Sequence, residues 1–381
     1  MNPNTTIKNN HPFLFNLPLA FIYLTINLLF VWKYLSNFLS PGWLLPVLYT
    51  IITSIILFLP LNKNRIKLPS YNTLLQYFST VAIFTVFLIW LMLQLDPNQL
   101  DVARYPALHN WIDRLLAGEF PYSPGGYPSG FPFLFILAIP FYLMGDLGLI
   151  QIFAFVAFSV IVYFKYKNNY IEAFRIIILL IASPIFLYEV AVRSELFSNI
   201  TAILLYLTLF EIFCEKDKKG LLTLVILGMI GGLLLSTRGI VLIIYIIFFG
   251  YMLLRYRYRY IIFGSSIVIG FALTIIPFLI WNCDHFIAYG PLTIQMWYIP
   301  AWFLALALIC SVACIFIVKT TASAFYAISI ILFGIVLCPF MEQVFIHGLT
   351  ETVMGNFFDI SYFCFALPFL LLSFRRVNVK T

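Results

Sequence analysis

Residues 74–95 read LLQYFSTVAIFTVFLIWLMLQL, an apolar stretch without a charged side chain. A helix needs about 20 apolar residues to cross the hydrocarbon core of a bilayer, so this stretch predicts a transmembrane helix. The next residues, 96–130, read DPNQLDVARYPALHNWIDRLLAGEFPYSPGGYPSG and combine acids, bases, a histidine and aromatic side chains. A span followed by a polar loop is therefore the unit from which both fold and function are predicted.

The rest of the chain has the apolar character of residues 74–95. Of its 381 residues, 63% are hydrophobic and 10% are charged, whereas soluble globular proteins carry about 25% charged residues. Too few polar side chains remain to cover a core of this size. The composition excludes a soluble enzyme, a disordered protein and a secreted disulfide scaffold, and predicts an all-α polytopic membrane protein.

Apolar runs predict about twelve transmembrane helices, with both termini in the cytoplasm. The stretch from Phe131 to Met144 is not counted, because it is short and contains Pro132 and Pro140. We expect it at the outer interface. The twelve expected spans are residues 12–36, 42–60, 74–95, 147–165, 175–191, 197–214, 221–236, 239–254, 261–281, 299–318, 322–340 and 359–374.

Charge predicts the orientation of these spans. Short loops rich in Lys and Arg are retained in the cytoplasm during insertion. With 131–144 outside, all five basic clusters fall inside and most acids fall outside, so the net charge of +7 indicates contact with membrane lipid and no nucleic-acid partner. The clusters are Lys63, Arg65 and Lys67; Lys165, Lys167 and Arg175; Lys216, Lys218 and Lys219; Arg255, Arg257 and Arg259; Arg375, Arg376 and Lys380.

Three outer segments are longer than a connection requires, namely 96–130, 282–298 and 341–358. In the first, an amphipathic interfacial helix is expected from Pro106 to Ala117, with Leu108, Trp111, Ile112 and Leu115 on one face. Gly118 is expected to end it. Chemistry is therefore expected at the outer membrane face.

Two further places put charge where the membrane penalises it. Ser183-Pro184 breaks a helix that then brings Glu189, Arg193 and Glu195 to the outer surface, and Arg238 lies in a tight outer turn, 236–239. Ionisable residues at such depths are functional-site candidates by default. The alternative is that Glu189 and Arg193, four residues apart, neutralise each other as a helical pair.

The order of these motifs resembles the glycosyltransferase C superfamily. The resemblance rests on Asp101-x-x-x-Tyr105, on Leu115-x-x-Gly118-x-x-Pro121-Tyr122, on Tyr127-Pro128 before an apolar run, and on Arg-Ser-Glu at 193–195. It is greatest to the polyprenyl-phosphate-mannose-dependent mannosyltransferases and to the first mannosyltransferase of GPI-anchor synthesis. It covers about residues 74–240; Pro128 stands alone where many members have two prolines, and the acidic pair of many members is reduced to Asp101.

The resemblance implies an integral-membrane enzyme with three regions. Residues 1–73 hold two spans and a cytoplasmic loop, 74–240 form a catalytic module with the outer loop 96–130, and 241–381 form C-terminal transmembrane helices. The enzyme would move a mannose-like hexose from a polyprenyl-phosphate donor to a glycan or glycolipid acceptor by a single inverting displacement. No cofactor is expected beside the lipid-phosphate sugar, which is the donor substrate.

Each residue type suits one part of that reaction. A carboxylate, Asp101, would take the proton of the acceptor hydroxyl, and Arg193, Arg238 and Arg104 would bind the leaving phosphate. Glu195, Tyr105, Tyr122 and Tyr127 are the expected sugar contacts, although Trp111 and Tyr122 also fit the aromatic belt of any membrane interface. His109, His285 and His347 lie on different outer segments without metal-binding spacing, so no metal site is expected.

Two other classes of function remain open. A transporter or flippase for lipid-linked glycans would carry ionisable residues near the midplane of several spans, whereas most charges here are expected at one outer level. A polymerase or ligase of envelope polysaccharides would carry its charged outer loop late in the chain. The expected location is a bacterial inner membrane with the site facing outward, or alternatively the endoplasmic reticulum membrane.

Overall fold

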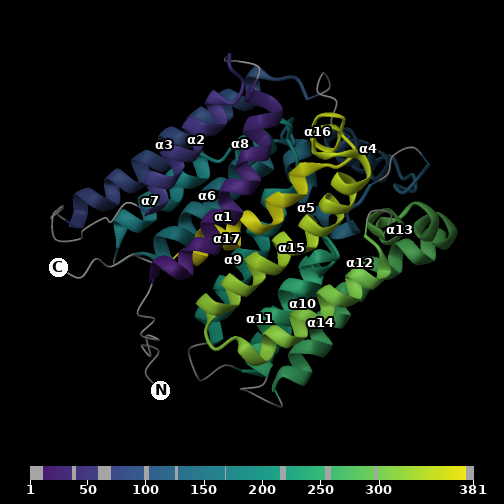
Figure 1. The fold of residues 1–381 in the computed structure, drawn as a ribbon. Coiled ribbons are helices and arrows are strands. Elements are labelled where there is room, and N and C mark those ends of the chain that lie inside the picture. Colours follow the sequence, from purple (N-terminus) through teal and green to yellow (C-terminus); the bar gives the residue numbers. More distant parts are fainter. Residues whose placement is uncertain are drawn as a thin grey trace.

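The computed structural model describes residues 12–36, 40–58, 70–97, 103–124, 128–167, 169–214, 220–253, 259–296 and 299–374. Within these ranges all regular structure is helical, as the sequence predicts. Most helices run side by side between the two ends of one bundle (Figure 1). In chain order they are α1 Pro12–Phe30, η1 Val31–Leu35, α2 Leu44–Phe58, α3 Ser70–Gln94, α4 Arg104–Leu116, α5 Pro132–Leu143, α6 Leu149–Lys165, α7 Tyr170–Ile181, α8 Pro184–Ala191, α9 Leu196–Cys214, α10 Leu221–Leu235, α11 Ile240–Leu253, α12 Arg259–Tyr289, α13 Pro291–Met296, α14 Ala301–Ile317, α15 Thr321–His347, α16 Leu349–Met354, η3 Ile360–Ala366 and α17 Leu367–Ser373.

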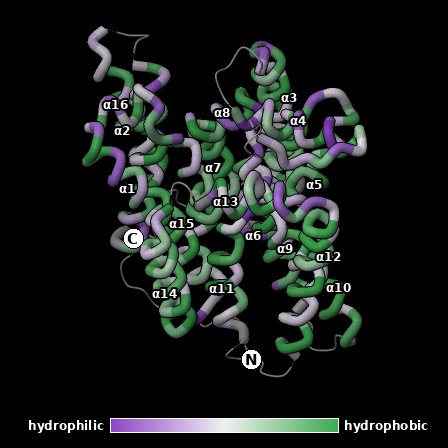
Figure 2. The backbone as a smooth tube through the Cα atoms, turned by 90° about the vertical axis from the view of Figure 1, so that its right-hand side faces the viewer, coloured by the Kyte–Doolittle hydropathy of each residue, from purple (hydrophilic) through white to green (hydrophobic). Residues whose placement is uncertain are grey.

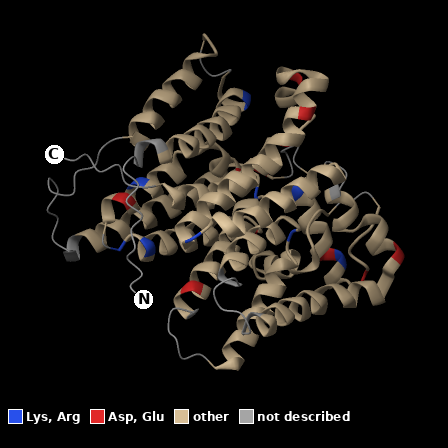
Figure 3. Ribbon diagram, turned by 60° about the horizontal axis from the view of Figure 1, so that its bottom comes forward, with Lys and Arg blue, Asp and Glu red and all other residues tan. Residues whose placement is uncertain are grey.

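The helices are those of a membrane-embedded protein. Among the described residues, five helices are long and apolar enough to cross a membrane, and six if the bent pair α7–α8 counts as one span. Apolar residues dominate the whole backbone (Figure 2), and acids and bases are few along it (Figure 3). Each remaining expected span contains a shorter apolar helix, so the count of twelve stays a prediction. The five long spans are Phe15–Leu35, Thr73–Gln94, Leu196–Phe213, Ile261–Gln295 and Thr321–His347.

The break predicted at Ser183-Pro184 is confirmed. Helix α7 ends at Ile181, and α8 starts at Pro184 after a bend of 59°. Proline cannot donate a backbone hydrogen bond and clashes with the preceding turn, so the helix axis changes direction there. Ser183 donates its hydroxyl to Asn27 of α1 at 2.6 Å, which holds the bend inside the bundle.

Two of the segments expected between spans are partly helical. Helix α12 bends at Asn282, whose φ of −157° and ψ of 90° leave the helical region, and then continues to Tyr289. Helix α15 runs past the expected end at 340 to His347, because no Gly or Pro occurs between residue 340 and Gly348, whose φ is +83°. Residues 282–289 and 341–347 are therefore helical extensions of spans.

The loop after α3 folds onto the bundle as a small core of its own. Leu108, Trp111 and Ile112 of α4 are buried, and the Trp111 ring stacks on Phe135 of α5 with centroids 4.3 Å apart. Gly118, with φ +75°, follows the last turn. The amphipathic helix and its buried face are confirmed, and it begins two residues earlier than expected, at Arg104.

Helix α5 occupies the apolar stretch that the sequence analysis did not count as a span. Its 12 residues reach about 18 Å at 1.5 Å per residue, well short of the hydrocarbon core of about 30 Å. Its first residues join the α10–α11 turn, where Phe131 N donates to Thr237 O and Phe133 N donates to Ser236 O, both at 3.0 Å. Helices α4 and α5 thus lie together over one end of the bundle.

Candidate functional site

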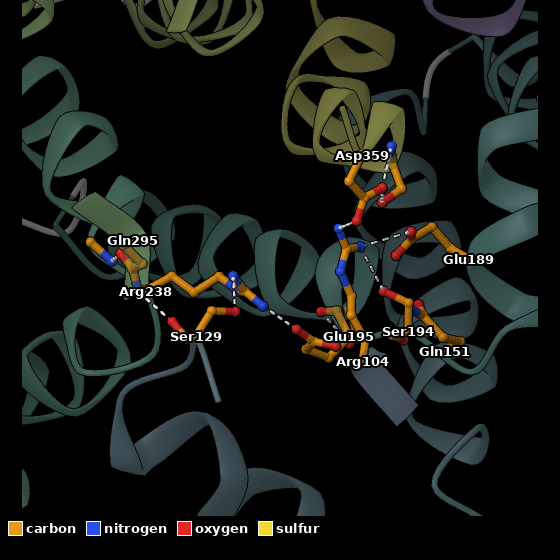
Figure 4. A network of polar contacts seen from close by, with 12 residues as sticks. Arg104, Ser129, Gln151, Glu189, Ser194, Glu195, Arg238, Gln295 and Asp359 are labelled. Carbon is orange, nitrogen blue, oxygen red and sulfur yellow. Dashed lines mark hydrogen bonds and ion pairs between the residues drawn. The ribbon is translucent and has the colours of Figure 1, made fainter. Parts of the chain in front are cut away.

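Three arginines from separate segments gather at the end of the bundle that α4 and α5 cover. Arg104 starts α4, Arg193 follows α8, and Arg238 lies in the turn between α10 and α11. Each is almost fully buried and paired with a carboxylate. Arg104 and Arg238 are joined through two consecutive residues, because Ser194 contacts Arg104 and Glu195 pairs with Arg238 (Figure 4).

Arg104 stands between two carboxylates in Figure 4. Its Nη1 lies 3.6 Å from Glu189 Oε1 and donates to Ser194 Oγ at 3.3 Å, while its Nη2 pairs with Asp359 Oδ2. The guanidinium also lies over the Tyr362 ring, 4.5 Å from its centroid. The Glu189 side chain is 0% exposed and that of Asp359 is 45% exposed, so Asp359 covers the open side of Arg104.

The surroundings of Arg104 keep it charged. Burial alone lowers the pKa of the guanidinium, but Asp359, Tyr362, Glu189 and Glu195 more than reverse this and raise it above its usual value. A buried carboxylate such as Glu189 is costly to ionise unless a cation lies beside it. Arg104 supplies that cation, and loop 96–130 is thereby tied to α8 and η3.

Arg238 forms the second centre. Its Nη2 pairs with Glu195 Oε1, and its Nη1 donates to Ser129 Oγ at 3.4 Å. Gln295 joins the same place, with its Nε2 donating to Ser129 O and its Oε1 accepting from Gly239 N at 3.2 Å. The centre therefore connects the α10–α11 turn, the start of α9 and the segment that leads into α5.

Arg193 is held differently. Val192 ends the helix, and Arg193 itself has a φ of +52°, which turns its side chain away from Glu189. Its Nε lies 2.9 Å from Asp146 Oδ1, and its Nη1 and Nη2 donate to Leu95 O and Met92 O, both at 3.2 Å. A helical Glu189–Arg193 pair is therefore wrong, because the two residues bind other partners.

Of the expected sugar contacts, Glu195 pairs with Arg238, and the two described tyrosines differ in their surroundings. Tyr105 is half-buried, and Arg193 lies 5.8 Å from the centroid of its ring. Tyr122 is fully buried within the small core and donates its hydroxyl to Gly130 O at 3.0 Å, so its side chain supports the loop. Asp101 and Tyr127 lie outside the described residues.

Two acids of this site were not predicted from the sequence. Asp146 pairs with Arg193 and accepts from Gly148 N at 2.7 Å just before α6, and Asp359 accepts from Ser361 N at 3.0 Å at the start of η3. Asp146 directly precedes the expected span 147–165, and Asp359 is the first residue of the expected span 359–374. An acid at the start of a span is the signal that would have found them. By contrast, Glu342, His347 and Glu351 are exposed.

Comparison of the chain with protein-family models, with curated proteins and with solved structures found no match.

Proposed function

We propose that the chain is an integral-membrane glycosyltransferase that moves a mannose-like hexose from a polyprenyl-phosphate donor to a glycan or glycolipid acceptor at the outer membrane face. The proposal includes twelve spans, cytoplasmic termini, kinship with the glycosyltransferase C superfamily and a bacterial inner membrane as the location. It rests on the motif order of residues 74–240 and on the chemistry of the two arginine centres.

The observation that carries the proposal is the joined pair of buried centres around Arg104 and Arg238. Burying an ion pair gains little stability, because the desolvation of both charges offsets their attraction. Two such pairs linked by Ser194 and Glu195 at one end of a largely apolar bundle are therefore a poor way to hold helices together. They are a suitable way to orient a charged lipid headgroup at the membrane surface.

The roles follow from what each centre leaves accessible. Arg104 faces Asp359 on its open side and is the group that binds the leaving phosphate, since a guanidinium pairs with phosphate oxygens through two N–H groups. Asp101, three residues before Arg104 in the chain, is the general base that takes the proton of the acceptor hydroxyl as its oxygen attacks the anomeric carbon. The phosphate then leaves from the opposite face, which inverts the configuration. Arg193 donates from both Nη atoms to the end of α3 and has Asp146 beside its Nε, so it positions the end of α3.

The test is sugar transfer by the full chain reconstituted in liposomes with a polyprenyl-phosphate hexose. Replacing the general base by its amide, Asp101→Asn, should lower the transfer rate by about 10²–10⁴-fold. Asp113→Asn is the matched control, because Asp113 lies on the same loop, is 42% exposed and contacts His109. It should stay close to wild type. Equal activity of the Asp101→Asn protein would refute the assignment.

The competing function is transport or flipping of a lipid-linked glycan. The gathering of Arg104, Arg193 and Arg238 at one end of the bundle argues against it, since alternating access requires a substrate site near the membrane midplane. The same liposomes separate the two functions. Movement of a fluorescent lipid-linked glycan between leaflets, without sugar transfer, would favour the flippase.

A further inference from the structure

The Arg238 centre holds buried polar atoms that find no hydrogen-bond partner among the described residues. They are Glu195 Oε2, Arg238 Nε and both amide atoms of Asn199. The three residues are 4%, 3% and 3% exposed. Buried polar atoms in proteins are nearly always satisfied by protein, water or a ligand, so each exception needs an explanation.

Glu195 directly precedes α9, and Asn199 lies in the first turn of that helix. Asn199 lies one helical turn after Glu195, and its backbone N donates to Glu195 O at 2.9 Å. Side chains four residues apart share one face of a helix. Arg238 contacts the same carboxylate from the neighbouring turn, and Ser236 in that turn has a fully buried hydroxyl that no described residue satisfies.

The kinds of unsatisfied atom select the class of ligand. Arg238 Nε and Asn199 Nδ2 are donors, whereas Glu195 Oε2 and Asn199 Oδ1 are acceptors. An anion would need donors alone, and a metal cation would need acceptors alone. A hydroxyl group both donates and accepts, and a sugar ring presents several of them. The Arg238–Glu195 pair is neutral as a whole, which also fits an uncharged ligand.

We propose that Glu195, Asn199 and Arg238 bind the hydroxyl groups of a neutral sugar ring. The inference rests on the proposed function and deepens it by dividing the substrate between the two centres. Arg104 takes the phosphate, and the Arg238 centre takes the sugar. Because Ser194 and Glu195 are consecutive, the two subsites are adjacent, as they must be for a sugar joined directly to a phosphate.

The experiment measures binding of methyl glycosides of mannose, glucose and galactose to the full chain in lipid nanodiscs, by tryptophan fluorescence, with inorganic phosphate as a second probe. Asn199→Leu keeps the size of the side chain and removes both amide atoms. In this variant the Kd of at least one glycoside that binds the wild-type protein should rise at least about tenfold. Phosphate binding should not change. The melting temperature should not fall, since an unsatisfied amide has been removed.

Thr201→Val is the matched control. Thr201 lies on the same helix, is 1% exposed and has a hydroxyl with no partner among the described residues, but it is two residues from Asn199 and so points to the other side of α9. This variant should bind glycosides as wild type does.

Glu195→Gln is the second variant, because it keeps the shape and replaces an acceptor by a donor; it should also weaken glycoside binding about tenfold.

Two results would overturn the inference. One is that no glycoside binds the wild-type protein, and the other is that Asn199→Leu and Glu195→Gln retain wild-type affinity, which would mean that water alone occupies the atoms. Failure of the proposed function looks different. Glycosides would then bind in an Asn199-dependent way, yet no sugar would be transferred from a polyprenyl-phosphate donor.

Discussion

The ion pairs Arg193–Asp146 and Arg238–Glu195 lie at the same end of the bundle but differ in what they leave unpaired. Both guanidinium groups are buried, with Arg193 6% and Arg238 3% exposed. Arg193 Nη1 and Nη2 each donate to a backbone carbonyl at the end of α3. Its Nε makes no hydrogen bond among the described residues but lies 2.9 Å from Asp146 Oδ1, which balances its charge. Arg238 has an Nε without a hydrogen-bond partner among the described residues, beside a carboxylate oxygen in the same condition.

The difference separates a structural pair from a binding pair. A buried charge whose hydrogen bonds are all made within the protein has nothing left for a ligand, and removing it leaves unpaired groups behind. A pair with free donors and acceptors can exchange water for a ligand at little cost. The three predictions below test this distinction through stability on one side and substrate affinity on the other.

The largest expected effect is on stability. Arg193→Ala leaves Asp146 and the carbonyls of Leu95 and Met92 without their partner. Breaking a buried ion pair costs about 3–5 kcal/mol, and the value should lie at the lower end because the Asp146 side chain is 24% exposed. Denaturant unfolding of the purified protein in detergent measures it. The fraction that remains folded should bind donor normally.

Arg114→Ala is the control for that measurement. Arg114 pairs with Glu119 at 3.5 Å, and their side chains are 39% and 60% exposed. Exposed pairs contribute about 0–1 kcal/mol, so the unfolding curve should hardly move. If Arg193→Ala behaved like Arg114→Ala and instead lost donor affinity, Arg193 would be a phosphate ligand as the sequence analysis expected.

The second prediction is an effect on affinity of about one decade. Arg238→Lys keeps the positive charge beside Glu195 and loses the planar group that carries Nε. We expect the KM for the polyprenyl-phosphate donor to rise about tenfold, the value of one charge-assisted hydrogen bond, about 1.5 kcal/mol. The melting temperature should change little, whereas Arg193→Lys should lower it. Unchanged KM in Arg238→Lys would make Arg238 a counterion of Glu195 only.

Much of the fold was predictable because a membrane protein needs long apolar helices and keeps its charged residues near their ends. The bend at Ser183-Pro184, the helix over 104–116 and the gathering of Arg104, Arg193 and Arg238 at one end all follow from such local rules. Which acid each arginine pairs with does not follow from local rules, because it depends on the direction of the side chain. Arg193 pairs with Asp146, 47 positions earlier in the chain, because its φ of +52° takes it out of the helix of Glu189.

The same reasoning explains what was missed at the site. Asp359 reaches Arg104 across 255 positions of sequence, a distance over which no periodicity or motif gives a signal. Asn199 is an unremarkable residue inside an apolar run, and only its burial without a partner singles it out. Sequence patterns predicted the elements and the ends of the bundle, and packing determined the pairs.

The smallest expected effect concerns Asp359, the exposed partner of Arg104. Asp359→Asn removes its charge, while the amide oxygen can still accept from Ser361 N and cap η3. Since the Asp359 side chain is 45% exposed, the loss of stability should stay below about 1 kcal/mol. Arg104 would keep Glu189 and Ser194, and its Nη2 would be free for a phosphate oxygen.

Because an anionic ligand no longer has to displace a carboxylate, the apparent Kd for inorganic phosphate, measured by titration in nanodiscs, should fall several-fold. The matched variant is Arg104→Gln, which should abolish phosphate binding in both backgrounds. Weaker phosphate binding by Asp359→Asn would mean that Asp359 orients Arg104 for its ligand. Of the ion pairs compared above, only Arg238–Glu195 would then be a candidate for ligand binding.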